Sequence, residues 1–105
     1  MKALEVRVRH GLSQEEVRRR LDEALVRARD QYRESVGAIE ADWENDNRMR
    51  VRVAVMGMNF DGSIEVLIEE LLVKLELPGM ATLFAGQIRE GIEERLGGLL
   101  GSQQV

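Results

Sequence analysis

The residues of this chain that could do chemistry are few, and they do not form a recognisable catalytic set. His10 is the only histidine, and neither a cysteine nor a second histidine is present to complete a metal site with it. No serine stands in a relation to His10 that would make it an activated nucleophile. A lone histidine beside a glycine at a strand end is usually a solvated or capping residue. We therefore predict no catalytic, metal-ligating or cofactor-binding role for His10.

Carboxylates close to the single tryptophan suggest acid–base chemistry. Asp42, Glu44 and Asp46 all lie near Trp43. A catalytic carboxylate needs a shifted pKa, which comes from burial or from a neighbour of like charge. The strand acids of this stretch are instead expected to face arginines, which keep a carboxylate ionised, and Asp46 is explained by loop geometry. We therefore expect a protein that is not an enzyme and that has no cofactor.

Composition excludes several further classes of function. The 105 residues include no cysteine, which rules out thiol nucleophiles, redox disulfides and zinc–thiolate sites. The net charge of −4 argues against nucleic acid as a partner. No apolar run approaches the ~20 residues of a membrane span, and charges occupy the amino terminus where a signal peptide would be apolar. We expect one cytoplasmic domain over residues 1–100 and a frayed tail over 101–105.

Two runs in the middle of the chain are charge mirrors of each other. Acids alternate with apolar residues over 39–44, and arginines alternate with apolar residues over 48–53. A three-residue loop over 45–47 would place each acid opposite an arginine: Glu44 with Arg48, Asp42 with Arg50 and Glu40 with Arg52. The same register pairs Trp43 with Met49, Ala41 with Val51 and Ile39 with Val53. This pattern predicts an antiparallel hairpin with one apolar face and one charged face.

Similar patterns place the remaining elements. Leu4, Val6 and Val8 alternate with charges and predict a first strand. Ser13 and Glu16 form a capping box, so a helix should begin at Gln14. Its apolar stripe is expected to run from Val17 to Tyr32, with Gly37 as its stop: Val17, Leu21, Ala24, Leu25, Ala28 and Tyr32.

Two more strands and a closing helix complete the chain. A turn at Gly57-Met58 would oppose Val51 to Ile64 and Arg50 to Glu65. A turn at Glu69-Glu70 would oppose Val66 to Val73 and place Glu65 beside Lys74. Pro78 can open the last helix, whose apolar stripe is Phe84, Ile88, Ile92, Leu96 and Leu99. Three glycines in this helix, Gly86, Gly91 and Gly97, suggest a close backbone approach to the sheet or to a partner.

The predicted order is therefore β-α-β-β-β-β-α. We expect a two-layer α+β domain, with a five-stranded antiparallel sheet in the order 2-3-4-5-1 and both helices on its apolar face. Strands around a long carboxy-terminal helix make this architecture similar to the helix-grip folds.

Two sets of residues are candidate binding sites. The stretch Leu77–Phe84 is apolar on nearly all sides, and two leucines are expected to pair on the outward face of the sheet. These residues form a candidate apolar contact surface for docking or for a homodimer: Leu77, Met80, Leu83, Phe84, Leu67 and Leu72. Three aromatic residues, Trp43, Phe60 and Phe84, are core residues or, alternatively, the lining of a ligand cavity.

The sequence resembles the polyhydroxyalkanoic acid system proteins, small bacterial proteins associated with the regions of polyester storage granules. The resemblance covers nearly the whole chain and is carried by His10–Ser13, Asp42–Asp46, Phe60–Gly62, Leu77-Pro78, Phe84–Ile88 and Ile92–Leu96. Asn45 stands where the family pattern has a glycine, and asparagine tolerates the same left-handed backbone. The resemblance implies a cellular setting and supplies no catalytic residues.

Two functions follow from these observations. The first is a non-enzymatic cytoplasmic protein whose partner is the granule surface or a granule-associated protein, bound through the apolar contact surface. The alternative is a carrier of a hydrophobic acyl or lipid ligand, held in a cavity between the sheet and the last helix. Neither requires nucleic acid, a metal or a transmembrane segment.

Overall fold

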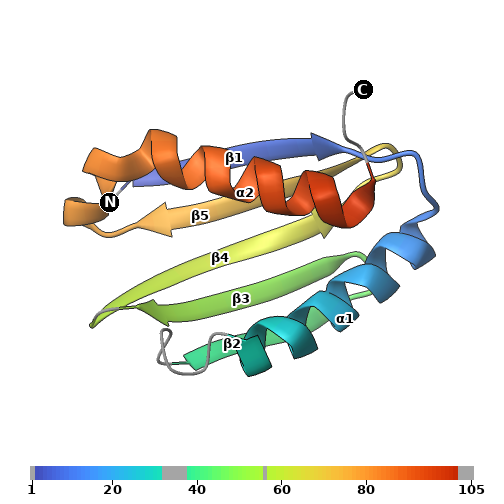
Figure 1. Cartoon of the computed structure of the whole chain (residues 1–105), viewed down its shortest axis with the longest axis horizontal. Coiled ribbons are helices and arrows are strands. Elements are labelled where there is room, and N and C mark those ends of the chain that lie inside the picture. The colour runs from blue at the N-terminus through green and yellow to red at the C-terminus, as the bar shows by residue number, and fades with distance from the viewer. Residues whose placement is uncertain (1, 32–37, 56, 102–105) are drawn as a thin grey trace.

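A computed structural model describes residues 2–31, 38–55 and 57–101 (Figure 1). The elements are β1 (Lys2–Arg9), α1 (Gln14–Gln31), β2 (Ala38–Asn45), β3 (Arg48–Val55), β4 (Met58–Val66), β5 (Glu70–Leu77), the 3-10 helix η1 (Gly79–Phe84) and α2 (Ala85–Leu100). The strands form one antiparallel sheet in the order β1-β5-β4-β3-β2. Both helices lie on the same face of this sheet, with α2 over β1 and β5. The predicted α+β class and strand order are confirmed.

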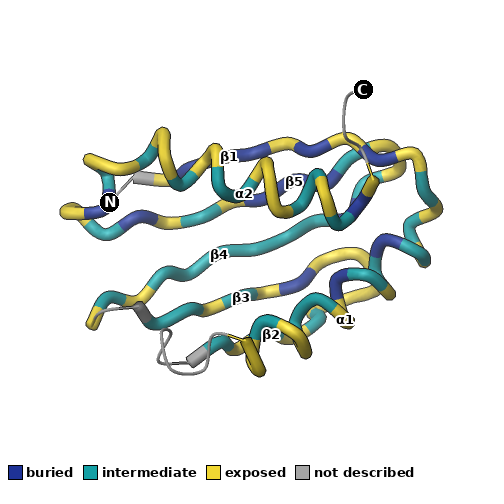
Figure 2. The backbone as a smooth tube through the Cα atoms, in the orientation of Figure 1, coloured by how far each residue is buried: buried dark blue, intermediate teal, exposed yellow. Residues whose placement is uncertain are grey.

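The core lies mainly between α2 and the β1–β5 half of the sheet. Alternate residues of these two strands point inward, as their sequence pattern requires, and they are buried together with residues of the helices. Figure 2 shows this concentration of buried residues on β1 and β5. The buried core residues are Leu4, Val6, Val8, Val17, Leu21, Met49, Val66, Leu71, Val73, Leu77, Ala81 and Leu100. The β3–β4 half is less covered, since the inward residues Val51, Phe60 and Ile64 are only partly buried.

The hairpin of β2 and β3 forms nearly as predicted. Glu40 pairs with Arg52 and Asp42 with Arg50, and all three apolar pairs are present. A bulge after Trp43 sets Asn45, and not Glu44, opposite Arg48. The predicted three-residue loop is therefore a two-residue turn, in which the N–H of Asn47 donates to Oδ1 of Asn45 at 2.8 Å.

The outward side of β2–β5, which we call the charged face, carries the expected ion pair of Glu44 with Arg48 and two pairs that were not predicted. Glu44 contacts two arginines, Arg48 at 3.2 Å and Arg50 at 3.5 Å. Arg52 donates to Asp61 of β4 at 2.7 Å, and this hydrogen bond raises the pKa of Arg52. Exposed pairs of this kind add little to the stability of a fold, so their main effect is to keep this face in water.

The other two hairpins were predicted in the wrong register. Val55 pairs with Met58, so that Gly57, at φ +79°, is the second residue of the turn and Val51 faces Gly62. The N–H of Leu67 donates to the oxygen of Glu70 at 2.9 Å, which centres the next turn on Ile68-Glu69 and pairs Val66 with Leu71. Both registers differ from the prediction by two residues. Because side chains alternate with period two, every residue keeps its predicted face.

The partners of Glu65 also change with this shift. Glu65 faces Arg48 and Leu72, and Ser63 lies between Arg50 and Lys74. The expected bridging of Glu65 between Arg50 and Lys74 is therefore wrong.

Strands β4 and β5 approach each other closely at Gly62. A Cβ atom added there would overlap the backbone oxygen of Lys74 and lie 3.1 Å from Cδ1 of Leu75. A backbone oxygen cannot rotate away as a flexible side chain can. Only glycine fits this position of β4 without a shift of the strands.

The close backbone approach to the sheet that was expected at three glycines of α2 is not found at two of them. A Cβ at Gly86 or Gly91 would meet nothing within 4 Å, so neither marks a close approach to the sheet. The helix ends at Gly101, which is left-handed at φ +69°. The expected stop of α1 at Gly37 and the end of its stripe at Tyr32 lie outside the described residues.

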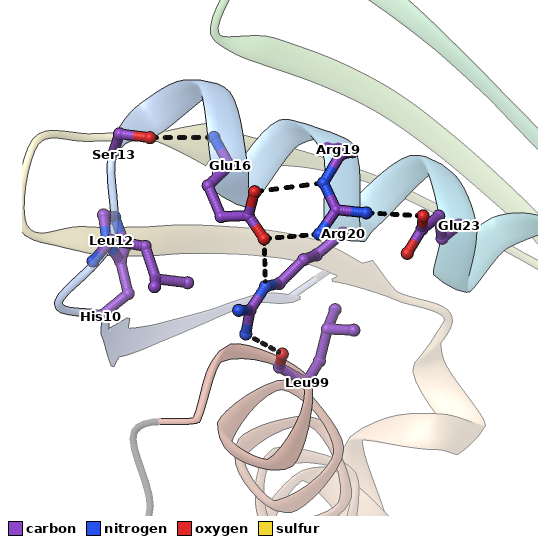
Figure 3. Close-up of polar contacts among 8 residues, drawn as sticks. All are labelled: His10, Leu12, Ser13, Glu16, Arg19, Arg20, Glu23 and Leu99. Atoms are coloured by element: carbon purple, nitrogen blue, oxygen red, sulfur yellow. Dashed lines mark hydrogen bonds and ion pairs between the residues drawn. The ribbon is translucent and has the colours of Figure 1, made fainter.

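Helix α1 begins at Gln14, as predicted, because Ser13 caps it. The hydroxyl of Ser13 accepts from the N–H of Glu16 at 3.1 Å (Figure 3). A capping box also needs a hydrogen bond from the backbone N–H of Ser13 to the Glu16 carboxylate, and none is present among the described bonds. The Glu16 carboxylate accepts instead from Arg19, at 2.6 and 3.1 Å, and from Arg20 at 2.8 Å. These bonds, with that of Arg19 the largest influence, lower the pKa of Glu16 from 4.5 to about 2.

We expect the lowered pKa of Glu16 to make part of the stability of this protein acid-sensitive. Its folded pKa is below its unfolded one, so its contribution is fully present above about pH 5 and is lost as the pH falls toward 2. A Glu16→Gln variant should be less stable than the wild type at pH 7, with a gap that narrows toward pH 2. Urea unfolding midpoints measured across this pH range test the prediction, and a gap independent of pH would contradict it.

Candidate functional site

The candidate site is an exposed apolar patch on η1. Pro78 ends β5, and the chain from Leu77 to Ile88 carries no charged residue. Within η1, Met80 is 77% exposed, Leu83 84% and Phe84 54%. Met80 and Leu83 are three residues apart, which places them on the same side of a 3-10 helix. We call Met80, Leu83 and Phe84 the η1 patch.

The other three residues predicted for the apolar contact surface do not belong to the η1 patch. Leu77 is fully buried, because it ends β5 on the inward face of the sheet. Leu72 does lie on the outward face, but it does not pair with Leu67 and is only 8% exposed between Arg7 and Glu65. The methylene groups of such long side chains can cover a leucine. Leu67 is partly buried in the β4–β5 turn.

Two exposed apolar residues were missed by the sequence interpretation. Val26 on α1 is 67% exposed, and Ile68 in the β4–β5 turn is 77% exposed. Ile68 precedes β5 and η1 follows it, so the two lie at opposite ends of this strand and Ile68 is separate from the η1 patch. Isolated exposed apolar side chains are common on protein surfaces, and no periodicity marks them in advance.

Trp43 and Phe60, two of the three aromatic residues predicted to line a cavity, lie apart on the sheet. Trp43 shares a row of the sheet with Met49 and Ile64. Phe60 is four residues from Ile64 along β4, a separation of roughly 13 Å. Phe84 belongs to the η1 patch. Trp43 and Phe60 therefore do not share the lining that the sequence suggested.

Trp43 instead joins α1 to the β2–β3 hairpin. Its Nε1–H donates to Oδ1 of Asp22 at 2.9 Å, and the Arg18 guanidinium lies 4.6 Å from the centre of its ring. Arg18 also donates to the backbone oxygen of Asp46 at 3.2 Å. Of the carboxylates that suggested acid–base chemistry, Asp46 takes part in this contact through its backbone oxygen, and Glu44 instead contacts Arg48 and Arg50.

A Trp43→Phe change should destabilise the protein by about 1–2 kcal/mol. It removes the hydrogen bond to Asp22 and weakens the stacking with Arg18 while keeping an aromatic ring. Urea unfolding provides the measurement. Asp22→Asn, which keeps an oxygen acceptor for the indole N–H, is the control and should cost less. Equal stability of wild type and Trp43→Phe would contradict this role.

His10 is buried and hydrogen-bonded, whereas the sequence suggested a solvated or capping residue. Nδ1 accepts from the N–H of Leu12 at 3.3 Å, and Nε2–H donates to the oxygen of Leu67 at 3.1 Å. The His10 backbone N–H donates to the oxygen of Glu69 at 2.9 Å. His10 therefore ties the β1–α1 connection to the β4–β5 turn.

The fold and the patch together define a small α+β protein with one charged sheet face and an apolar end. The sequence matches the family described as "Putative polyhydroxyalkanoic acid system protein" over residues 4–100. The chain belongs to this family, which confirms the resemblance found in the sequence.

Other comparisons add little about function. No curated protein matches the sequence. The crystal structure of TTHA0849 from Thermus thermophilus is similar at 14% identity and a TM-score of 0.43, over 95% of this chain and 92% of that one. A likeness at this level says nothing about activity. Among the described residues, no helix is both long enough and apolar enough to span a bilayer.

Proposed function

We propose that this protein is a non-enzymatic cytoplasmic protein that binds the surface of polyhydroxyalkanoate storage granules through the η1 patch. The family supplies the setting, since its description names the polyhydroxyalkanoic acid system. The observation that carries the binding mode is the exposure of Met80, Leu83 and Phe84 within an uncharged stretch of chain. An aliphatic polyester surface offers apolar contact without charged groups to pair.

The energetics of such adsorption are favourable. Fully burying an apolar side chain of this size contributes about 1.5–3 kcal/mol. The patch needs no large rearrangement, because its side chains already point into solvent while Leu77 and Ala81 anchor the segment in the core. Arginine contacts to the carboxylates of the charged face, and the structural bonds of His10, support a role without catalysis.

A fluorescent fusion in a granule-forming cell tests the proposal. We expect fluorescence at the granule rim in cells that store polyester and uniform fluorescence in the same strain without granules. Uniform fluorescence in cells that contain granules would contradict the proposed function.

A further inference from the structure

The two helices converge at one end of the sheet and separate toward the other. At the converging end, Nη1 of Arg20 donates to the backbone oxygen of Leu99 at 3.1 Å, and Glu16 holds the other side of that guanidinium (Figure 3). The arginine lies at the carboxyl end of α2, where a cation is favoured. Away from this contact, Figure 1 shows β3 and β4 between the two helices, covered by neither.

A groove of about 720 Å³ lies between α1 and α2. Its volume is in the range of small-molecule sites, about 300–1,000 Å³. Its apolar walls are Ala24 and Ala28 of α1 and Gly91, Leu96, Gly98 and Leu99 of α2. A Cβ atom added at Gly91 would meet nothing within 4 Å. The helix therefore has a residue of poor helix propensity at a point where the protein itself does not need the space.

Charged side chains flank these apolar walls. Arg27 of α1 and Arg95 of α2 also line the groove, with Glu94 as the only acid among its described lining residues. The groove therefore has a net positive charge, although the whole chain carries −4. Arginine binds carboxylates with two parallel hydrogen bonds, while glutamate can accept a hydrogen bond from a hydroxyl group.

We propose that the groove between α1 and α2 binds a free hydroxyalkanoic acid. The alkyl chain lies along the alanine, glycine and leucine walls, and the carboxylate is bound by the arginines. The choice of a hydroxylated acid, the building block of the polyester, rests on the proposed function. The site is distinct from the η1 patch, because no residue of that patch lines the groove.

The test is a titration of the isotope-labelled full-length protein with 3-hydroxydecanoic acid below its micelle concentration, followed by amide NMR. We expect saturable shifts at Ala24, Ala28, Gly91 and Gly98. Decanol, with the same chain length but no carboxylate, should bind at least tenfold more weakly, and Arg27→Gln should weaken binding of the acid severalfold. Absence of saturable shifts at these residues, or equal binding of acid and alcohol, would overturn the proposal.

A matched pair of glycine variants separates blocking of the groove from effects on the helix. Gly91→Leu fills the groove and should weaken binding at least tenfold. Gly86→Leu is on the same helix, also in open space, but outside the groove, and should bind as the wild type does. Equal binding by both variants would contradict the site. Shifts that follow protein concentration, with a dimer seen by analytical ultracentrifugation, would show that a second copy covers the groove and would overturn the proposal.

The two proposals can fail separately. A wild-type protein that lies on granules but does not bind the acid overturns the groove proposal alone. A protein that binds the acid but remains uniformly distributed in granule-containing cells overturns the granule proposal alone.

Discussion

Replacing both Met80 and Leu83 with serine is expected to reduce binding to polyester particles at least a hundredfold. Each side chain would otherwise contribute about 1.5–3 kcal/mol when buried against the polymer. A combined loss of about 3 kcal/mol already exceeds a factor of one hundred. Both residues are largely exposed in the free protein, so the double change should leave folding stability nearly unaltered. Co-sedimentation of purified protein with polyhydroxyalkanoate particles measures the effect.

The matched control changes two apolar residues of comparable exposure elsewhere on the surface. Val26→Ser with Ile68→Ser removes side chains that are 67% and 77% exposed, but neither belongs to the η1 patch. This variant should bind particles as the wild type does. If both double variants lose binding equally, adsorption depends on general surface hydrophobicity and the patch has no special role.

A Gly62→Ala change is expected to destabilise the fold by about 3 kcal/mol, the upper end of the usual range for overpacking. The new methyl group would overlap the backbone oxygen of Lys74, so relief requires β4 and β5 to separate where they are hydrogen-bonded. Thermal or urea unfolding gives the measurement.

A glycine-to-alanine change in α2 should have the opposite effect on the stability of the protein. Gly91→Ala adds its methyl group where nothing lies within 4 Å, so the gain in helix propensity, about 1 kcal/mol, should appear as increased stability. A Gly62→Ala protein as stable as the wild type would show that the two strands can move apart at little expense.

Much of the fold could be predicted from the sequence because charge and apolar character alternate in register. The pairing of Asp42 with Arg50 and of Trp43 with Met49 is specified twice, once by charge and once by hydrophobicity. The β3–β4 register was not fixed in this way, because opposite charges fit both alternatives: Glu65 could face Arg50, as predicted, or Arg48, as it does. Gly57 could also be either residue of its turn. A shift of two residues preserves the inward and outward faces, so the hydrophobic pattern could not detect it.

The candidate site was only partly predictable for a different reason. An apolar run predicts that residues such as Leu77 and Leu83 will contact other apolar groups. It does not predict which of them will be buried in the core of the protein and which will be exposed. The end of β5 buries Leu77, and the tight winding of η1 then turns Met80 and Leu83 outward. The groove between the helices depends on their divergence, which no local pattern encodes. Gly91 was the available signal, and it was interpreted as close packing.

The position of η1 at one end of the molecule has a consequence for how a granule coat would be built. The protein measures 36 × 27 × 25 Å, and η1 lies at one extreme of the longest dimension (Figure 1). A copy held by its η1 patch would therefore stand with its long axis perpendicular to the granule surface. The area that it covers on the granule would be set by its two shorter dimensions. Neighbouring copies would meet side by side, charged face included, while the β1–α1 connection and the β4–β5 turn would form the outer rim. That rim is the first part of the coat that an approaching protein would touch.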